Sequence, residues 1–106
     1  MTFPTFRVDA IMGYRKDVAY SHSTAYGNFK MAVRAIANQA GVPDLATTTM
    51  QVDVEIHWTK RARLDGDNVL KAVVDGLFRQ DRLLAGASWR RDLGAPSEYL
   101  IVTVSW

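Results

Sequence analysis

The chain lacks cysteine and any long apolar segment, and it carries little net charge. With no cysteine among its 106 residues it can form neither a disulfide bridge nor a thiolate zinc site, a composition that fits a reducing cytoplasm. No apolar run approaches the roughly 20 residues of a membrane span, and residues 1–5 show neither the basic start nor the apolar stretch of a signal peptide. We therefore expect a cytoplasmic protein with no membrane partner.

The net charge of +2 is too small to define a partner, so the local distribution of charge matters more. Basic residues form two groups around a predicted helix: Lys60, Arg61 and Arg63 before it, and Arg79, Arg82, Arg90 and Arg91 after it. Such groups can contact the phosphates of a nucleic acid and release counterions. They are also typical of solvated charge around a helix, and composition does not decide between the two interpretations.

Hydrophobic periodicity predicts five regular elements in one domain that spans residues 1–106. Alternation of apolar and polar residues predicts strands, and apolar residues at three- and four-residue intervals predict helices. In chain order, these elements fall at about 5–11, 24–39, 48–58, 67–78 and 98–106. The order β-α-β-α-β predicts an α/β (α+β) fold, with a single mixed β-sheet and two helices packed on one face. One extra short strand after the second helix is left open.

The second face of the predicted sheet is not uniformly polar. In the strand at 48–58, Val54 and Ile56 alternate with polar residues, which indicates one covered and one solvated face. In the last strand, Tyr99 and Ile101 fall on the side opposite the main apolar row. We therefore expect that side to be covered by a helix or by a second subunit.

Two carboxylates precede a lysine where the second helix is predicted to begin. Asp65 and Asp67, if they converge about 5 Å apart at an effective dielectric of about 20, repel by roughly 3 kcal/mol. A helix N-terminus returns only about 0.3–1 kcal/mol per acid. A divalent cation would offset the repulsion, and Mg²⁺ prefers one or two carboxylates with several waters. If the acids point apart into water, no metal is needed, and the spacing alone does not decide.

Lys71 and Asp81 extend this candidate site. Lys71 lies four residues after Asp67, on the same side of the helix, where its ammonium could reach a bound phosphate or stabilise charge on phosphorus. The alternative is a surface ion pair between Asp67 and Lys71. Asp81 follows the helix, where the dipole disfavours an acid, so a neighbouring arginine or a metal would explain its position.

The segment 63–77 resembles the RusA family of Holliday junction resolvases, small endonucleases common in prophages. The family pattern is an acid, one residue, Asp-Asn, two residues, Lys-Ala, then Asp and Leu within the same turns. The matching residues are Asp65, Asp67, Asn68, Lys71, Ala72, Asp75 and Leu77. A looser likeness covers most of the chain, with a strand before the motif and a helix that starts within it.

The resemblance implies a homodimeric, structure-selective endodeoxyribonuclease that binds four-way DNA junctions and cuts them symmetrically in recombination and repair. It implies Mg²⁺ as cofactor, with Mn²⁺ as a substitute. Asp65, Asp67 and Asp81 match metal ligands, and Lys71 matches the essential lysine. The family carries an Asp-Asp pair where this chain has Gln80-Asp81, and the segment that leads to it is shorter here.

On this interpretation the basic residues contact the DNA backbone. Those expected to do so are Lys60, Arg61, Arg63, Arg79, Arg82 and Arg90. Two alternatives remain open. One is a catalytically impaired module that binds DNA junctions, suggested by the acid missing beside Asp81. The other is a structural or interaction domain whose acids only cap a helix.

Overall fold

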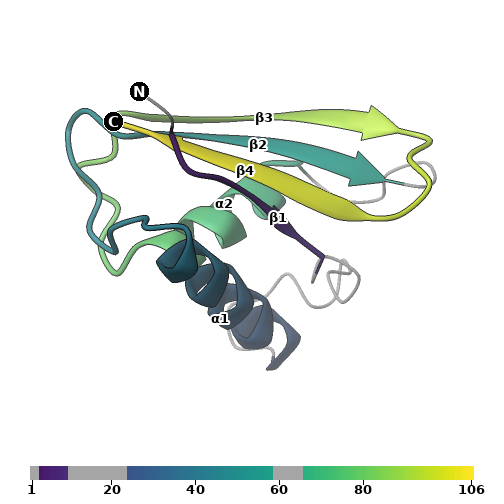
Figure 1. The fold of residues 1–106 in the computed structure, drawn as a ribbon, viewed down its shortest axis with the longest axis horizontal. Coiled ribbons are helices and arrows are strands. Elements are labelled where there is room, and N and C mark those ends of the chain that lie inside the picture. The colour runs from purple at the N-terminus through teal and green to yellow at the C-terminus, as the bar shows by residue number, and fades with distance from the viewer. Residues whose placement is uncertain (1–2, 10–23, 59–65) are drawn as a thin grey trace.

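A computed structural model describes residues 3–9, 24–58 and 66–106, which form four strands and two helices (Figure 1). The elements, in chain order, are β1 Thr5–Val8, α1 Thr24–Gln39, β2 Gln51–Trp58, α2 Gly66–Leu77, β3 Gly86–Leu93 and β4 Tyr99–Ser105. The order is therefore β-α-β-α-β-β. The five predicted elements are present, and β3 is the additional strand that the sequence left open.

The strands form one mixed sheet in the order β1-β4-β2-β3. β2 and β3 are parallel, while β4 is antiparallel to both β1 and β2. This confirms the predicted fold class. β3 has eight residues and carries the run Arg90-Arg91-Asp92, so its apolar period is weak. Charges of this kind are typical of an edge strand, which pairs on one side only.

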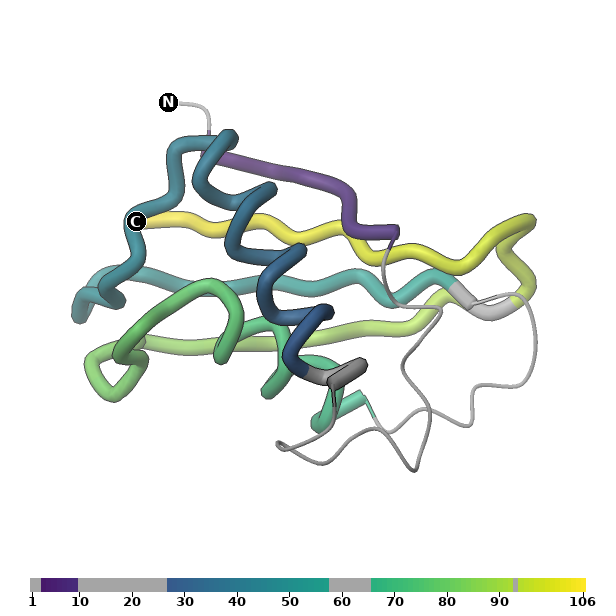
Figure 2. The backbone as a smooth tube through the Cα atoms, turned by 90° about the horizontal axis from the view of Figure 1, so that it is seen from below, coloured from purple at the N-terminus to yellow at the C-terminus, as the bar shows by residue number. Residues whose placement is uncertain are grey.

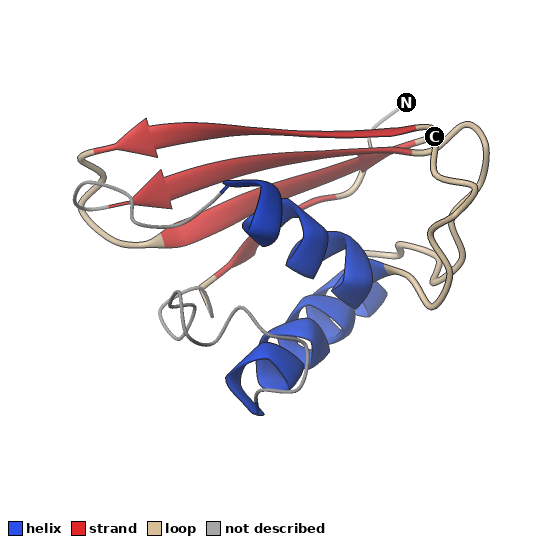
Figure 3. Cartoon of the chain, turned by 180° about the vertical axis from the view of Figure 1, so that it is seen from behind, coloured by secondary structure: helices blue, strands red, loops and turns tan. Residues whose placement is uncertain are grey.

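Both helices cover the same face of the sheet (Figures 1 and 3). α2 packs over β2 and β3, and α1 packs against α2 and β1, so the two helices divide the face between them (Figure 2). One hydrophobic core joins the layers. Its residues with no exposed side-chain surface include Val8, Val33, Val54, Ile56, Val69, Val73, Leu77, Leu100 and Val102. Neither described helix combines the length and apolar character that a membrane span requires.

The opposite face of the sheet carries a layer of polar and aromatic side chains. Within the described residues no helix lies on this face, so the predicted covering helix is not found there, while a covering subunit remains a prediction. His57 stacks on Tyr99 with ring centroids 4.4 Å apart. Arg90 reaches across from β3 to the carboxylates of Asp53 at 3.3 Å and Glu55 at 2.8 Å.

Candidate metal and nucleic-acid site at the start of helix α2

The start of α2 is set by a close approach between the helix and β3. Gly66 is the first helical residue and is buried. A Cβ atom added there would lie 2.5 Å from Cε2 and Cε3 of Trp89, far inside ordinary van der Waals contact. Glycine at this position therefore lets the helix begin directly against the indole ring. Asp67 lies in the first turn rather than at the N-cap, because the helix begins one residue earlier than predicted.

Asp67 and Lys71 are both exposed and lie one turn apart on α2. Oδ1 of Asp67 accepts a hydrogen bond of 2.8 Å from Nε1 of Trp89. Lys71 forms no hydrogen bond or ion pair with any residue in the described ranges, so the alternative Asp67–Lys71 pair is not formed. The Lys71 ammonium is consequently not held by a neighbouring carboxylate of the described chain.

The donor chemistry at this end of α2 fits a hard divalent cation. Asp67 supplies one exposed carboxylate, and Asp65 stands two residues before it in the sequence. Mg²⁺ is commonly held by one or two carboxylates together with waters, so these two acids would suffice. No group of three or more acidic or histidine side chains that could hold a metal is found among the described residues. Asp65, Lys60, Arg61 and Arg63 lie outside those residues.

Asp81 lies at the other end of α2. The helix has 12 residues, a length of about 18 Å, and Asp81 follows its last residue by four positions. The chain there runs beside the segment after α1, where the amide of Ala46 donates to the Gln80 carbonyl at 3.2 Å. The predicted ligand set of Asp67 with Asp81 is therefore not brought together within the chain, because the backbone continues away from the start of the helix.

Three of the predicted DNA contacts also lie away from Asp67. Arg79 follows α2 and pairs through Nε with Asp44 at 2.8 Å. Arg82 is exposed in the loop that leads to β3. Arg90 lies on the face of the sheet opposite the helices, where it is engaged by Asp53 and Glu55. The structure thus separates these arginines from the start of α2.

Trp89 contacts Asp67 but was not among the predicted site residues, and Arg91, named with the basic groups, was not among the predicted DNA contacts. Both lie on the helix side of β3, and the guanidinium carbon of Arg91 is 5.0 Å from the centroid of the Trp89 ring. Side chains alternate along a strand, so Arg91 shares a face with Trp89 whereas Arg90 does not. Had residues 86–93 been recognised as a strand, Arg91 rather than Arg90 would have been predicted as a DNA contact.

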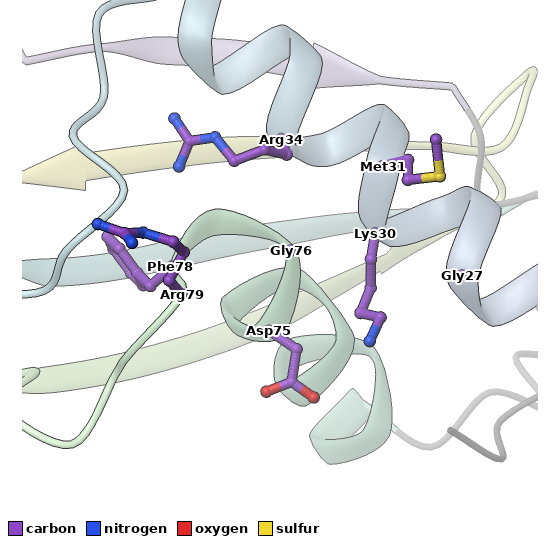
Figure 4. A pocket seen from close by; sticks show the side chains of 8 residues that line it. All are labelled: Gly27, Lys30, Met31, Arg34, Asp75, Gly76, Phe78 and Arg79. Carbon is purple, nitrogen blue, oxygen red and sulfur yellow. The ribbon is translucent and has the colours of Figure 1, made fainter. Parts of the chain in front are cut away.

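An open groove of about 410 Å³ lies farther along α2, between α1 and α2 (Figure 4). It is lined by Gly27, Lys30, Met31, Arg34, Asp75, Gly76, Phe78 and Arg79. Arg34 donates to the backbone carbonyls of Leu77 and Val42, which holds the two helices together. The groove lies along the second half of α2, so it does not adjoin Asp67.

Comparison with known proteins gives no family model that matches the chain and no curated protein that matches it. The functional interpretation therefore depends on the motif and on the geometry of the described residues.

Proposed function

We propose that the protein is a Mg²⁺-dependent endonuclease that acts in the cytoplasm and resolves four-way DNA junctions by paired phosphodiester cleavage. The substrate is branched DNA, and the reaction is hydrolysis of one backbone bond in each of two strands. Two copies related by a twofold axis would match the symmetry of paired cuts. The biological role would lie in DNA recombination and repair.

One observation carries this proposal: the spacing Asp-x-Asp-Asn-x-x-Lys falls at the start of a helix that leaves its acid and lysine exposed. Asp67 and Lys71 lie one turn apart, and Lys71 is not neutralised by any residue in the described ranges. A lysine that merely balanced Asp67 would be expected to pair with it. An acid and a separate ammonium on one side of a helix are suited to a metal and to a phosphate, respectively.

Each residue has a distinct role in the proposed reaction. Asp65 and Asp67 would hold the metal, with waters in its other positions. When bound, Mg²⁺ would polarise the scissile phosphate and activate a water for attack. Lys71 would donate to the phosphate oxygens as negative charge develops on them in the transition state. Arg91, Lys60, Arg61 and Arg63 would contact the DNA backbone.

The direct test uses a labelled mobile four-way junction incubated with the protein and Mg²⁺, and in parallel with EDTA. We expect symmetrically paired nicks only with Mg²⁺. Asp67→Asn should abolish cleavage and retain junction binding, because the amide keeps the shape of the side chain but is a poor ligand for Mg²⁺. Unchanged cleavage by this variant would contradict the assignment.

Asp9→Asn is the matched control for that variant. Asp9 follows β1, which lies at the sheet edge opposite β3, and its carboxylate pairs with Arg7 at 2.8 Å. The substitution removes the same charge from an exposed acid far from α2. Cleavage by Asp9→Asn should equal that of the wild type, which would exclude a general effect of net charge on DNA binding.

A catalytically impaired junction-binding module is the second candidate, and the position of Asp81 favours it. With Asp81 beyond the far end of α2, the acids that the motif itself supplies are Asp65 and Asp67. This alternative predicts junction binding that weakens with salt, because phosphate contacts release counterions. It predicts no cleavage at any concentration of Mg²⁺ or Mn²⁺, so the same assay separates the two candidates.

A further inference from the structure

Trp89 holds a position between the sheet and the start of α2. It lies on the helix side of β3, opposite Val54 of β2, and packs against the edge of the hydrophobic core. Its ring touches the backbone of Gly66 so closely that no larger residue fits there without movement. The indole is therefore held by packing on the residue that immediately precedes Asp67.

The same ring is bonded to the Asp67 carboxylate. Nε1 of Trp89 donates to Oδ1 of Asp67 at 2.8 Å, a normal length for a hydrogen bond to a charged acceptor. An indole has one donor and no acceptor, so a packed ring offers its proton in one fixed direction. A carboxylate has about four lone-pair sites, and the Trp89 N–H occupies one of them. The bond thus restrains the orientation of Asp67 and does not by itself prevent the carboxylate from binding a cation.

We propose that Trp89 is a positioning residue that orients Asp67 for the metal, an inference that rests on the proposed nuclease function. An exposed aspartate samples several side-chain rotamers. If its carboxylate is already held in the rotamer that binds the metal, it loses less conformational freedom when the ion binds. Partners of this kind, bonded to a metal ligand rather than to the metal, commonly tune affinity. The guanidinium carbon of Arg91 lies 5.0 Å from the centroid of the same ring.

A purely structural role for Trp89, as a contact between α2 and β3, makes a different prediction. In that case the ring matters and its N–H does not. Replacing Trp89 with benzothienylalanine separates the two roles, because sulfur replaces N–H while both rings keep their shape. Trp89→Phe is the simpler second variant, with a smaller ring and no donor. Trp106→Phe is the control, because it removes an indole from a C-terminal residue that contacts Phe3 instead.

The measurement is Mn²⁺ binding to the DNA-free protein, with free Mn²⁺ followed by electron paramagnetic resonance. We expect the benzothienylalanine variant to bind Mn²⁺ about 10-fold more weakly, the lower end of the range for such partners. Its melting temperature should stay close to that of the wild type, because the packing is kept. Trp106→Phe should bind as the wild type does, and Asp67→Asn should lose most of the affinity.

A second readout leaves Trp89 itself unchanged. In a protein with Trp58→Phe and Trp106→Phe, Trp89 is the only tryptophan, and paramagnetic Mn²⁺ bound to Asp67 should quench its fluorescence. The quenching midpoint should match the binding midpoint, and Asp67→Asn should remove it. Binding that depends on Asp67 but leaves the Trp89 emission unchanged would overturn the inference.

The outcomes distinguish this inference from the function on which it rests. Equal Mn²⁺ affinity in the wild type and the benzothienylalanine variant, with weaker binding by Asp67→Asn, overturns the role of Trp89 and leaves the metal site standing. Equal affinity in the wild type and Asp67→Asn overturns the metal site itself, and the inference with it. A selective loss in the benzothienylalanine variant supports both.

Discussion

The two ends of helix α2 carry similar kinds of charged side chain but use them differently. At the C-terminal end, Arg34 of α1 donates to the Leu77 carbonyl, one of the groups that a helix end leaves without an internal partner. Arg79 donates its backbone N–H to the Asp44 carbonyl at 2.8 Å and pairs with the Asp44 carboxylate. The cations there are engaged in joining α2 to α1 and to the segment that follows α1.

At the N-terminal end the acid and the lysine are both exposed. Asp67 is exposed and is oriented by Trp89, and Lys71 makes no ion pair with the rest of the described chain. The two ends thus differ in what their charged side chains contact within the described residues. We propose that the start of α2 carries the chemistry, whereas the charges at its end stabilise the fold.

The largest effect that tests this comparison is expected at Lys71. If its ammonium stabilises the transition state, Lys71→Ala should lower the cleavage rate by about 100-fold or more, as the loss of one such donor commonly does. Junction affinity should change little, because one phosphate contact is a small part of a multi-contact interface. Single-turnover cleavage with saturating protein measures the first quantity, and a gel-shift titration measures the second.

Lys30→Ala is the matched control for Lys71→Ala. Lys30 extends from α1 toward α2 and lines the groove between the two helices (Figure 4), so the substitution removes the same charge from a residue outside the motif. Cleavage by this control should stay near the wild-type rate. If both substitutions slow cleavage equally, the start of α2 has no special role and the comparison fails.

The next effect concerns stability and lies at the other end. Arg34→Ala removes the donors to the Leu77 and Val42 carbonyls, and hydrogen bonds to a charged group contribute about 1.5–3 kcal/mol. For a domain of this size, we expect the melting temperature to fall by roughly 10 °C. Arg34→Lys should recover only part of this loss, because an ammonium cannot reproduce the planar fork.

Thermal unfolding followed by circular dichroism measures this effect, with Arg82→Ala as the control. Arg82 is exposed in a loop, so its removal should change stability by no more than about 0.5 kcal/mol. The folded Arg34→Ala protein should bind Mn²⁺ as the wild type does at low temperature. A loss of Mn²⁺ affinity with no loss of stability would reverse the roles assigned to the two ends.

The sequence predicted the fold well where burial produces a clear period. Burial alternates along β4, and Val54, Ile56 and Val102 are fully buried on the face that the apolar period indicated. β3 was left as an open alternative because an edge strand can keep charged residues on both sides, which weakens its period. Its pairing with β2 depends on the path of the chain through α2, which local sequence does not encode.

For a related reason, the sequence predicts only the local geometry of the candidate site. The motif placed Asp67 and Lys71 correctly on one side of a helix, because helical spacing is a local property. Asp81 was grouped with them as an acid at the unfavourable end of the helix dipole and then by family likeness, although its distance from Asp67 is set by the direction in which the chain leaves α2. Trp89 gave no chemical signal in the sequence, and its bond to Asp67 depends on the register of β3 beside α2.

The smallest expected effect is at Asp81. The family likeness predicts that this residue binds the metal, whereas its position after the far end of α2 predicts that it does not. Asp81→Asn should leave the Mn²⁺ affinity of the DNA-free protein within about 2-fold of the wild type, because substitutions at distant sites without shared partners act independently. Asp67→Asn, measured in the same titration, should weaken binding strongly. If Asp81→Asn instead weakens Mn²⁺ binding as much as Asp67→Asn does, the two acids share an ion. Because α2 is about 18 Å long, Asp81 at that ion would then come from a second copy of the chain. Repeating the titration across a dilution series decides this point, since a site shared between copies loses affinity as the copies separate.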